Sequence, residues 1–320
     1  MSIERGDIQK DEVLTRFSVG TIKEHPRAAD LLFPFVPVGK ETGIYYKWDA
    51  STGRRAVDTL RARKARSVQA EMSISTATYT CKEYALHDVL EDAIVANADA
   101  VVKGGMRERA ARHVLNLLRL GREKRAVTLA TTATNYPVAH RIVGGADWGT
   151  ITVVTKTEVD TAKELIRKAW GELSNIAMLI THPVLNALRT NNDVKEAIKY
   201  VMQAKNSDIT PELLAGYYGV DRLYVAGATE ETAKEGATSS VADLWPDDVI
   251  VWRYEDNPNQ ADVGLFGATH AVDNEVFQVG MQSNRWREEG VRGEFIEECM
   301  TVQENIVNNT LGVHIDDVLA

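Results

Sequence analysis

The sequence predicts a mixed α+β fold in which a folded body carries an extended basic hairpin. Three observations support it. Residues 39–84 alternate like two strands and contain few core side chains, residues 86–125 have helical spacing over an unusual length, and residues 156–272 alternate helix and strand patterns. The 320 residues, 44% of them hydrophobic, suit a globular chain of at most two compact units.

The N-terminal part predicts an arm followed by the hairpin. Residues 1–38 show little periodicity, and we expect an arm with one short helix near 7–17. Prolines and glycines then punctuate an extended stretch, in which 44–48 predicts one strand and the alternation over 72–80 predicts a second. A hairpin such as 39–84, with so few core residues, is marginal in isolation and needs a surface to lie on.

A long helical pattern follows the hairpin. Apolar residues recur at helical spacing from Leu86 to Arg125, a length on the order of 50 Å at 1.5 Å per residue. Gly104 and Gly105 interrupt this pattern, so the sequence leaves open a single kinked helix or a break between two helices. Residues 126–156 are rich in threonine, valine and glycine and predict strands and loops.

The second half predicts alternating helices and strands. Helices are expected at 158–174, capped by Thr157, and again after Thr181, Asp193 and Thr210, where capping residues or an early proline precede apolar spacing. The expected strands of this part are 176–180, 223–228, 249–254 and 263–270. Two further strands, 276–282 and 293–307, are expected to be antiparallel and joined near 285–290, before a helix-poor tail.

Charge and cysteine content exclude several classes of protein. The chain has 37 Lys and Arg against 46 Asp and Glu, a formal charge of −9, which argues against a protein that coats nucleic acid. Two cysteines, Cys81 and Cys299, cannot build a disulfide framework or a four-cysteine zinc site. The first thirty residues lack the apolar core of a signal peptide, and no stretch is long enough to span a bilayer.

The sequence contains no familiar catalytic motif. Its seven histidines are scattered without metal-ligand spacing. Cys81 lies near His87 in sequence, but a nucleophilic cysteine needs a positioned base and an orienting group, so we expect a structural role. The acidic stretch 243–262 could bind calcium, yet it does not match an EF-hand, and a solvated loop is favoured. We therefore expect no enzyme, no cofactor and no metal site.

The basic run in the hairpin is the most specific local feature. It could be a solvated edge that discourages aggregation, a nucleic-acid surface, or a contact between subunits. No aromatic residue interleaves its charges, which disfavours nucleic acid. We favour a contact with acidic stretches of another copy, such as 243–262 or 288–304. The residues expected to make this contact are Arg54, Arg55, Arg61, Arg63, Lys64 and Arg66.

The order of these segments resembles the major capsid protein of tailed bacteriophages, with its HK97-like fold. The resemblance begins in LLFPFVPVGKETGIYYKWD, continues in TYTCKEYALHDVLED and in the helix-strand-helix ELIRKAWGELSNIAMLITHPVLNALRTNNDVKEAI, and ends in DVGLFGATHAVDNEVFQVGMQSNRWREEGVRGEFIEECMTV. Each motif alone is loose, and the specificity lies in their order. The resemblance implies an N-terminal arm (1–38), an extended loop (39–84), a peripheral domain with a spine helix (85–155), an axial domain (156–272), and return strands with a tail (273–320).

This resemblance implies a structural subunit that assembles into pentamers and hexamers of an icosahedral shell, enclosing double-stranded DNA without sequence-specific binding. It implies a virion protein assembled in the host cytoplasm, with portal and decoration proteins as partners. About thirty residues precede Leu31, so we expect a separate scaffolding protein rather than a fused one. Some relatives cross-link a loop lysine to asparagine, for which Lys40, Lys47 and Lys64 are candidates in principle.

Two alternatives stay open at this point. An encapsulin-type compartment shares the fold and differs in enclosing a cargo protein. Residues 150–280 could instead form a small α+β enzyme with the hairpin as a lid, in which case mutation of His182 or His270 should abolish turnover.

Overall fold

The computed structural model describes residues 8–48, 56, 59–61, 63, 66–67, 69, 74–99, 105–143, 147–199, 209–259 and 264–319. The chain divides into two compact units, each built from separate stretches of sequence. The first unit combines Met1–Gly43, Thr78–Thr128 and Ala268–Asn305. The second combines Ile44–Ala77, Leu129–Gly267 and Ile306–Ala320. None of the helices in the described ranges is long and apolar enough to cross a membrane.

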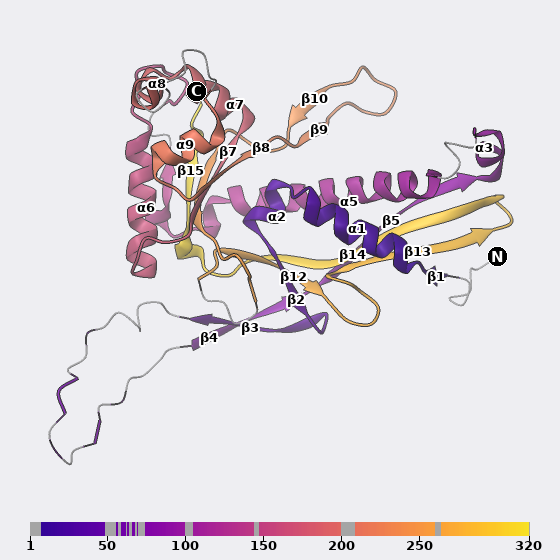
Figure 1. Cartoon of the computed structure of the whole chain (residues 1–320), viewed down its shortest axis with the longest axis horizontal. Helices are drawn as coiled ribbons and strands as arrows, with labels where there is room; N and C mark the ends of the chain where they lie inside the picture. Colours follow the sequence, from indigo (N-terminus) through magenta and orange to yellow (C-terminus); the bar gives the residue numbers. More distant parts are fainter. Residues whose placement is uncertain are drawn as a thin grey trace. The chain divides into compact units, whose positions relative to one another are not determined.

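The first unit is built on a six-stranded sheet (Figure 1). Its strands are β1 (Gln9–Lys10), β13 (Met281–Glu288), β14 (Gly293–Ile306), β12 (Gly267–Val272), β2 (Phe35–Val38) and β5 (Lys82–Glu91). The long strand β14 is antiparallel to both β13 and β5, whereas β2 runs parallel to β12. The antiparallel pairing and the second return strand are thus confirmed. The first strand is Met281–Glu288 rather than 276–282, and the connection is 289–292 rather than 285–290.

Two helices cover one face of this sheet. They are α1 (Glu12–Glu24), capped by the Asp11 carboxylate, and α5 (Met106–Thr131), whose 26 residues span about 39 Å. They lie along β13 and β14 in Figure 1, and the buried cluster Ile22, Leu115, Ala271, Met281, Met300 and Val302 joins them to the sheet. Shorter helices are α2 (Ala28–Leu32) and α3 (Asp92–Asn97). Helix α5 is the long helix that the sequence predicts, and this buried cluster holds it against the sheet.

The second unit is a five-stranded sheet flanked by helices. Its strand order is β6 (Arg141–Val143), β15 (Gly312–Asp316), β11 (Val249–Arg253), β7 (Ile176–Thr181) and β8 (Arg222–Ala226). The helices are α6 (Lys156–Trp170), α7 (His182–Thr190), α8 (Asn192–Lys199) and α9 (Pro211–Tyr218). Every residue of β7 and β11 is buried, as their unbroken apolar runs predict. Helix α9 ends at Gly219, whose φ of 63° favours glycine.

Smaller elements complete the described chain. Strands β9 (Thr229–Glu231) and β10 (Val241–Asp243) pair antiparallel, and β3 (Thr42–Trp48) pairs with β4 (Ile74–Thr80) in a separate two-stranded sheet. The single-turn helices are η3 (Ala133–Asn135), η4 (Val138–His140) and η5 (Asn309–Leu311). The pairing of β3 with β4 confirms the two strands predicted within 39–84; most of the predicted tip lies outside the described residues.

The predicted helix from Leu86 to Arg125 is wrong in its first part. Residues Lys82–Glu91 form strand β5 instead, because β14 offers a partner along ten residues. A long helix does follow, but it begins at Met106; Gly105 lies in a turn before it, and Gly104 lies outside the described residues. The helix also continues to Thr131, where strands were expected, since buried Ala126 and Ala130 continue its packing face.

Other boundaries differ by a few residues. Helix α1 occupies Glu12–Glu24 rather than 7–17, and α6 begins at Lys156, before the predicted cap. The Asn191 side chain, not that of Asp193, accepts the N–H groups that begin α8. The tail contains strand β15, which was missed because its partners β11 and β6 are distant in sequence.

Candidate functional site

The β3–β4 hairpin buries little of its own surface. Tyr45 and Tyr79 are buried, but Ile44 is 59% exposed, Tyr46 is 50% exposed, and Leu60 beyond β3 is 86% exposed. Large apolar side chains exposed on a two-stranded sheet are typical of a surface that another molecule covers. These exposed apolar side chains are what we expect of a hairpin that needs a surface to lie on.

The basic residues of the hairpin are only partly described. Arg61, Arg63 and Arg66 are exposed, whereas Arg54, Arg55 and Lys64 lie outside the described residues. Of the lysines considered for cross-linking, Lys40 is exposed and the Lys47 amino group lies 5.6 Å from the Tyr45 ring. The contact role of these side chains stays a prediction.

At the end of the hairpin that belongs to the first unit, a glycine makes room for a tyrosine. A Cβ on Gly43 would lie 2.5 Å from the Tyr79 hydroxyl, so a side chain there would displace the ring. The Tyr79 ring stacks on His270 with 4.7 Å between ring centroids. This stack anchors Tyr79 to strand β12 of the same unit.

Cys81 and His270 lie together but do not form a catalytic pair. The Cys81 thiol donates to the backbone carbonyl of His270 over 3.4 Å. Burial raises the pKa of Cys81 to about 11, and burial lowers the pKa of His270 to about 4. At neutral pH the pair is therefore a thiol and a neutral imidazole. His87, the other neighbour considered, packs against the rings of Trp286 and Phe295.

A buried group of charges, here called the arginine network, joins α5 to the rest of the first unit. Arg122 pairs with Asp30 of α2, and its Nη2 also donates to the Phe33 carbonyl and the Thr269 hydroxyl, each over 2.9 Å. Arg119 pairs with the other oxygen of Asp30 over 3.1 Å. On the opposite side, Glu304 of β14 lies 3.7 Å from the Arg122 Nε and 2.9 Å from the Arg125 Nη2. The side chains of Arg122, Asp30 and Glu304 are all less than a tenth exposed.

Glu298 of β14 is a buried carboxyl between two apolar clusters. Its neighbours on the same strand face, Ile296 and Met300, belong to the clusters that α1 and α5 cover. Both its oxygens lie 2.8 Å from the Ser283 hydroxyl. Burial raises its pKa to about 8, and the Ser283 hydrogen bond opposes that shift only in part. At neutral pH the group is mainly protonated.

Glu298 should make the first unit less stable as the pH rises. The unfolded chain releases the proton near the usual pKa of 4.5 and the folded chain only near pH 8, so stability falls across this window and levels off above it. Glu298→Gln, which keeps an uncharged hydrogen-bonding group, is expected to flatten this dependence and to be more stable than the parent at pH 8. Urea unfolding at several pH values measures it. Glu297→Gln on the same strand is the control, and an equal flattening in both variants would contradict the assignment.

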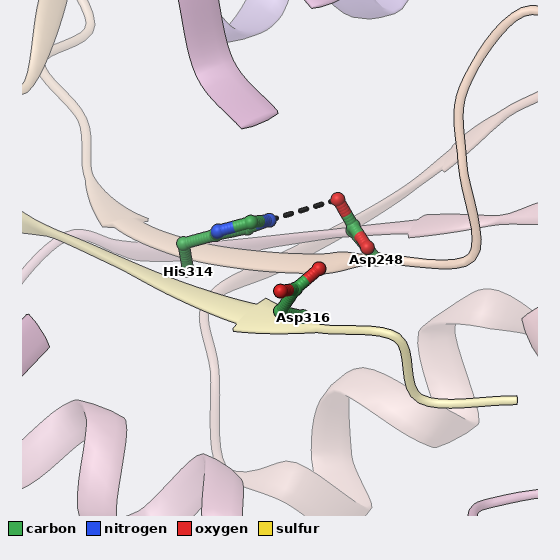
Figure 2. Close-up of side chains that lie close together, drawn as sticks. All are labelled: Asp248, His314 and Asp316. Carbon is green, nitrogen blue, oxygen red and sulfur yellow. Dashed lines mark hydrogen bonds and ion pairs between the residues drawn. The ribbon is translucent and has the colours of Figure 1, made fainter. Parts of the chain in front are cut away.

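In the second unit, three potential metal ligands meet between β11 and β15 (Figure 2). His314 and Asp316 lie two residues apart on one face of β15, and Asp248 precedes β11. One ligand atom from each lies within 4.8 Å of the others, a spacing that could hold a cation. However, Asp248 already accepts from the His314 Nε2 over 2.8 Å and from the Asp317 N–H over 3.1 Å. These bonds favour a structural role, fixing the tail to the sheet.

Asp248→Ala is expected to destabilise the chain by about 1–3 kcal/mol, because it leaves a buried imidazole nitrogen and the Asp317 N–H without their acceptor. Asp243→Ala, at an exposed position of β10, is the matched control and is expected to change stability by less than about 0.5 kcal/mol. Chemical denaturation of both variants checks the difference. Equal midpoints would show that the pair contributes nothing to folding.

The acidic stretch considered for calcium is in part neutralised by arginines. Arg253 pairs with Glu255 over 2.6 Å, and Arg222 pairs with Asp256 over 2.6 Å. Burial and the neighbouring carboxylates Asp243, Asp248 and Asp317 raise the pKa of Asp247. Asp243 and Asp256 are exposed, as the solvated loop favoured by the sequence requires, but Asp248 is buried, so that prediction is wrong for Asp248.

Comparison with known proteins shows which fold this is. No family model matches the chain. The major capsid protein of Pseudomonas phage JBD67 is 25% identical over 250 residues, which cover 75% of this chain and 76% of that protein. Among solved structures, a phage-related protein of Bordetella bronchiseptica RB50 superposes with a TM-score of 0.73 at 20% identity, covering 97% of both chains.

More distant structures share the same fold. The capsid of cyanophage P-SCSP1u matches with a TM-score of 0.56 at 11% identity over 89% of this chain and 86% of that one. The SrpI encapsulin of Synechococcus elongatus PCC 7942 matches less well, with a TM-score of 0.51 at 10% identity over 92% of this chain and 88% of that one. The chain therefore has the HK97-like capsid fold, as its segment order predicts.

Proposed function

We propose that this chain is the major capsid protein of a tailed bacteriophage, the structural subunit of an icosahedral shell that encloses double-stranded DNA. The observation that carries the proposal is the likeness to a phage major capsid protein over three quarters of both chains. The fold supports it, because the hairpin exposes apolar and basic side chains that a lone subunit leaves uncovered. The role is structural, without catalysis.

Each segment of the chain has the structural role that the resemblance to capsid proteins implies. Residues 39–84 are the extended loop that lies across a neighbouring subunit, and 156–272 form the axial domain at the centre of each pentamer or hexamer. Residues 1–38 are the N-terminal arm, while 85–155 and 273–320 form the peripheral domain. The basic residues of the loop make contacts between subunits. The two compact units support this division only for part of the chain. Residues 129–155 and 306–320, assigned here to the peripheral domain, belong to the second unit together with most of 156–272.

The shell is a homo-oligomer found in the virion. A separate scaffolding protein, a portal and decoration proteins are its further partners, and assembly takes place in the host cytoplasm. The shell holds the DNA without reading its sequence, which suits a subunit with a net charge of −9.

An encapsulin-type compartment is the second candidate, supported by the likeness to the SrpI encapsulin. It is the weaker one, because the curated relative is a phage capsid protein and the phage-related protein has the higher TM-score. A portal, terminase and protease encoded beside this chain would favour the capsid. A cargo enzyme encoded there would favour the compartment.

Light scattering coupled to size exclusion tests the proposal through particle mass. We expect the full chain, expressed alone or with a scaffolding protein from the same genome, to elute as particles of many subunits. A species with the mass of a single chain under both conditions would contradict the proposal.

A further inference from the structure

The first unit contains a cavity of about 660 Å³ between α1 and α5, for which the proposed capsid function gives no role. Four arginines line it, with His25 and a single carboxylate, Glu24. The arginines are Arg16 and Arg112, which are exposed, and Arg27 and Arg119, which are part-buried and buried. We call this hollow the basic cavity.

The two less exposed arginines of the basic cavity, Arg27 and Arg119, each keep one guanidinium nitrogen without a hydrogen-bond partner in the described part of the chain, although Arg119 also donates to the His25 carbonyl. Arg119 pairs with Asp30 over 3.1 Å, but its Nε has no hydrogen-bond partner within the described residues, and neither has the Nη1 of Arg27. Burial, and then the charge of Arg119, lower the pKa of Arg27, although Glu123 and Asp30 oppose this. Two positive guanidinium groups at one cavity wall repel each other, and an anion bound between them would offset that repulsion.

The exposed arginines extend this positive charge outward. Arg112 lies over the Phe17 ring, with 5.4 Å from its guanidinium carbon to the ring centroid. Arg16 has only a loose ion pair with Glu12, 3.9 Å long and well exposed, which contributes little in water. Both guanidinium groups are therefore available to a ligand that enters the cavity.

This composition matches a phosphate group. Guanidinium groups present planar forks of N–H donors that bind phosphate oxygens in pairs, and a phosphate has enough oxygens to engage several arginines at once. A cavity of this volume is in the range that holds a small ligand. A carboxylate has only two oxygens and would leave most of these donors unused.

We propose that the basic cavity is a binding site for phosphate groups. The phosphates come either from the backbone of enclosed DNA or from free phosphate in solution. The DNA source rests on the proposed capsid function, whereas the free-phosphate source does not.

Binding to unassembled full-length chain tests the proposal, with Arg16→Ala and Arg112→Ala together as the test variant. Both side chains are exposed, so the fold should persist. Arg109→Ala is the matched control, an exposed arginine on the same helix that does not line the cavity. The probes are a short fluorescent duplex DNA, followed by polarisation, and inorganic phosphate, followed by calorimetry.

We expect the parent and the control to bind at least one probe, and the double variant to bind it about tenfold more weakly or worse. If DNA binds, the slope of log affinity against log salt should fall by about 2 in the double variant, since each lost phosphate contact contributes about 0.9. Displacement of inorganic phosphate by DNA identifies the backbone as the source. Binding of inorganic phosphate that DNA does not displace identifies free phosphate.

The proposal is overturned if neither probe binds, or if the Arg109 control loses as much affinity as the double variant. It is also overturned if polyglutamate binds through these arginines while both phosphate probes fail, which would indicate an acidic protein segment. Electron microscopy of the same double variant separates this outcome from the capsid function. Shells should still form, because the proposal gives these two side chains no part in assembly.

Discussion

Replacing Arg122 with alanine is expected to destabilise the first unit by about 3–5 kcal/mol, enough to lower the yield of folded chain. The substitution leaves Asp30 with one cation instead of two and removes the donors to the Phe33 carbonyl and the Thr269 hydroxyl. Arg122, Phe33 and Thr269 are buried and the Asp30 side chain is only 9% exposed, so water cannot replace the lost partner. Urea unfolding followed by circular dichroism measures the loss.

A matched substitution separates this effect from the loss of any arginine on α5. Arg107 forms an ion pair with Glu294 over 2.9 Å, but its side chain is 58% exposed. Arg107→Ala is expected to cost less than about 1 kcal/mol. If the two variants unfold at the same urea concentration, the arginine network does not hold α5 to the unit.

Replacing Arg61, Arg63 and Arg66 together with alanine is expected to abolish most shell assembly while leaving the subunit folded. These side chains are exposed in the hairpin, so their replacement removes no buried side chain. If they contact acidic stretches of a neighbouring subunit, their loss weakens assembly and not folding. Sedimentation velocity gives the assembled fraction, and thermal unfolding of the unassembled chain reports its stability.

The control for this triple variant removes the same charge elsewhere. Arg167, Lys168 and Lys195 are exposed on helices of the second unit, and their joint replacement with alanine is expected to preserve assembly. Raising the salt concentration should weaken assembly of the parent, because salt screens the attraction between exposed charges. The screening length is about 8 Å at physiological ionic strength and becomes shorter as salt is added. A normal yield of intact shells from the hairpin variant would contradict the contact role.

Sequence patterns predicted the elements whose packing is encoded locally. The short unbroken apolar run of β7 is typical of a buried strand, and Thr210 with Pro211 and Gly219 marks both ends of α9. The pattern failed at β5, where Leu86 and Leu90 are four residues apart as in a helix; Ile94, the next of the series, does lie in a helix, α3. What makes this segment a strand is β14, some two hundred residues away, and no local pattern contains that partner.

The candidate sites were harder to predict for the same reason. Arg119 and Arg122 are charged residues on a long helix, where exposure to solvent is the usual expectation. Their burial is explained by ion pairs with Asp30 and Glu304, which are distant in sequence. His314 and Asp316 share a strand face, but no pattern in the C-terminal tail indicates that this segment pairs with β11. The paired strands β3 and β4 of the hairpin were predicted correctly because their alternation is itself visible in the sequence.

Electron microscopy of the purified full chain tests the capsid assignment most directly. The chain should be expressed alone and with a scaffolding protein from the same genome, and the particles imaged in negative stain and then in vitreous ice. We expect closed icosahedral shells of pentamers and hexamers, in which the 39–84 hairpin of each subunit lies across a neighbour. Fields that contain only single subunits or small open oligomers under both conditions would contradict it.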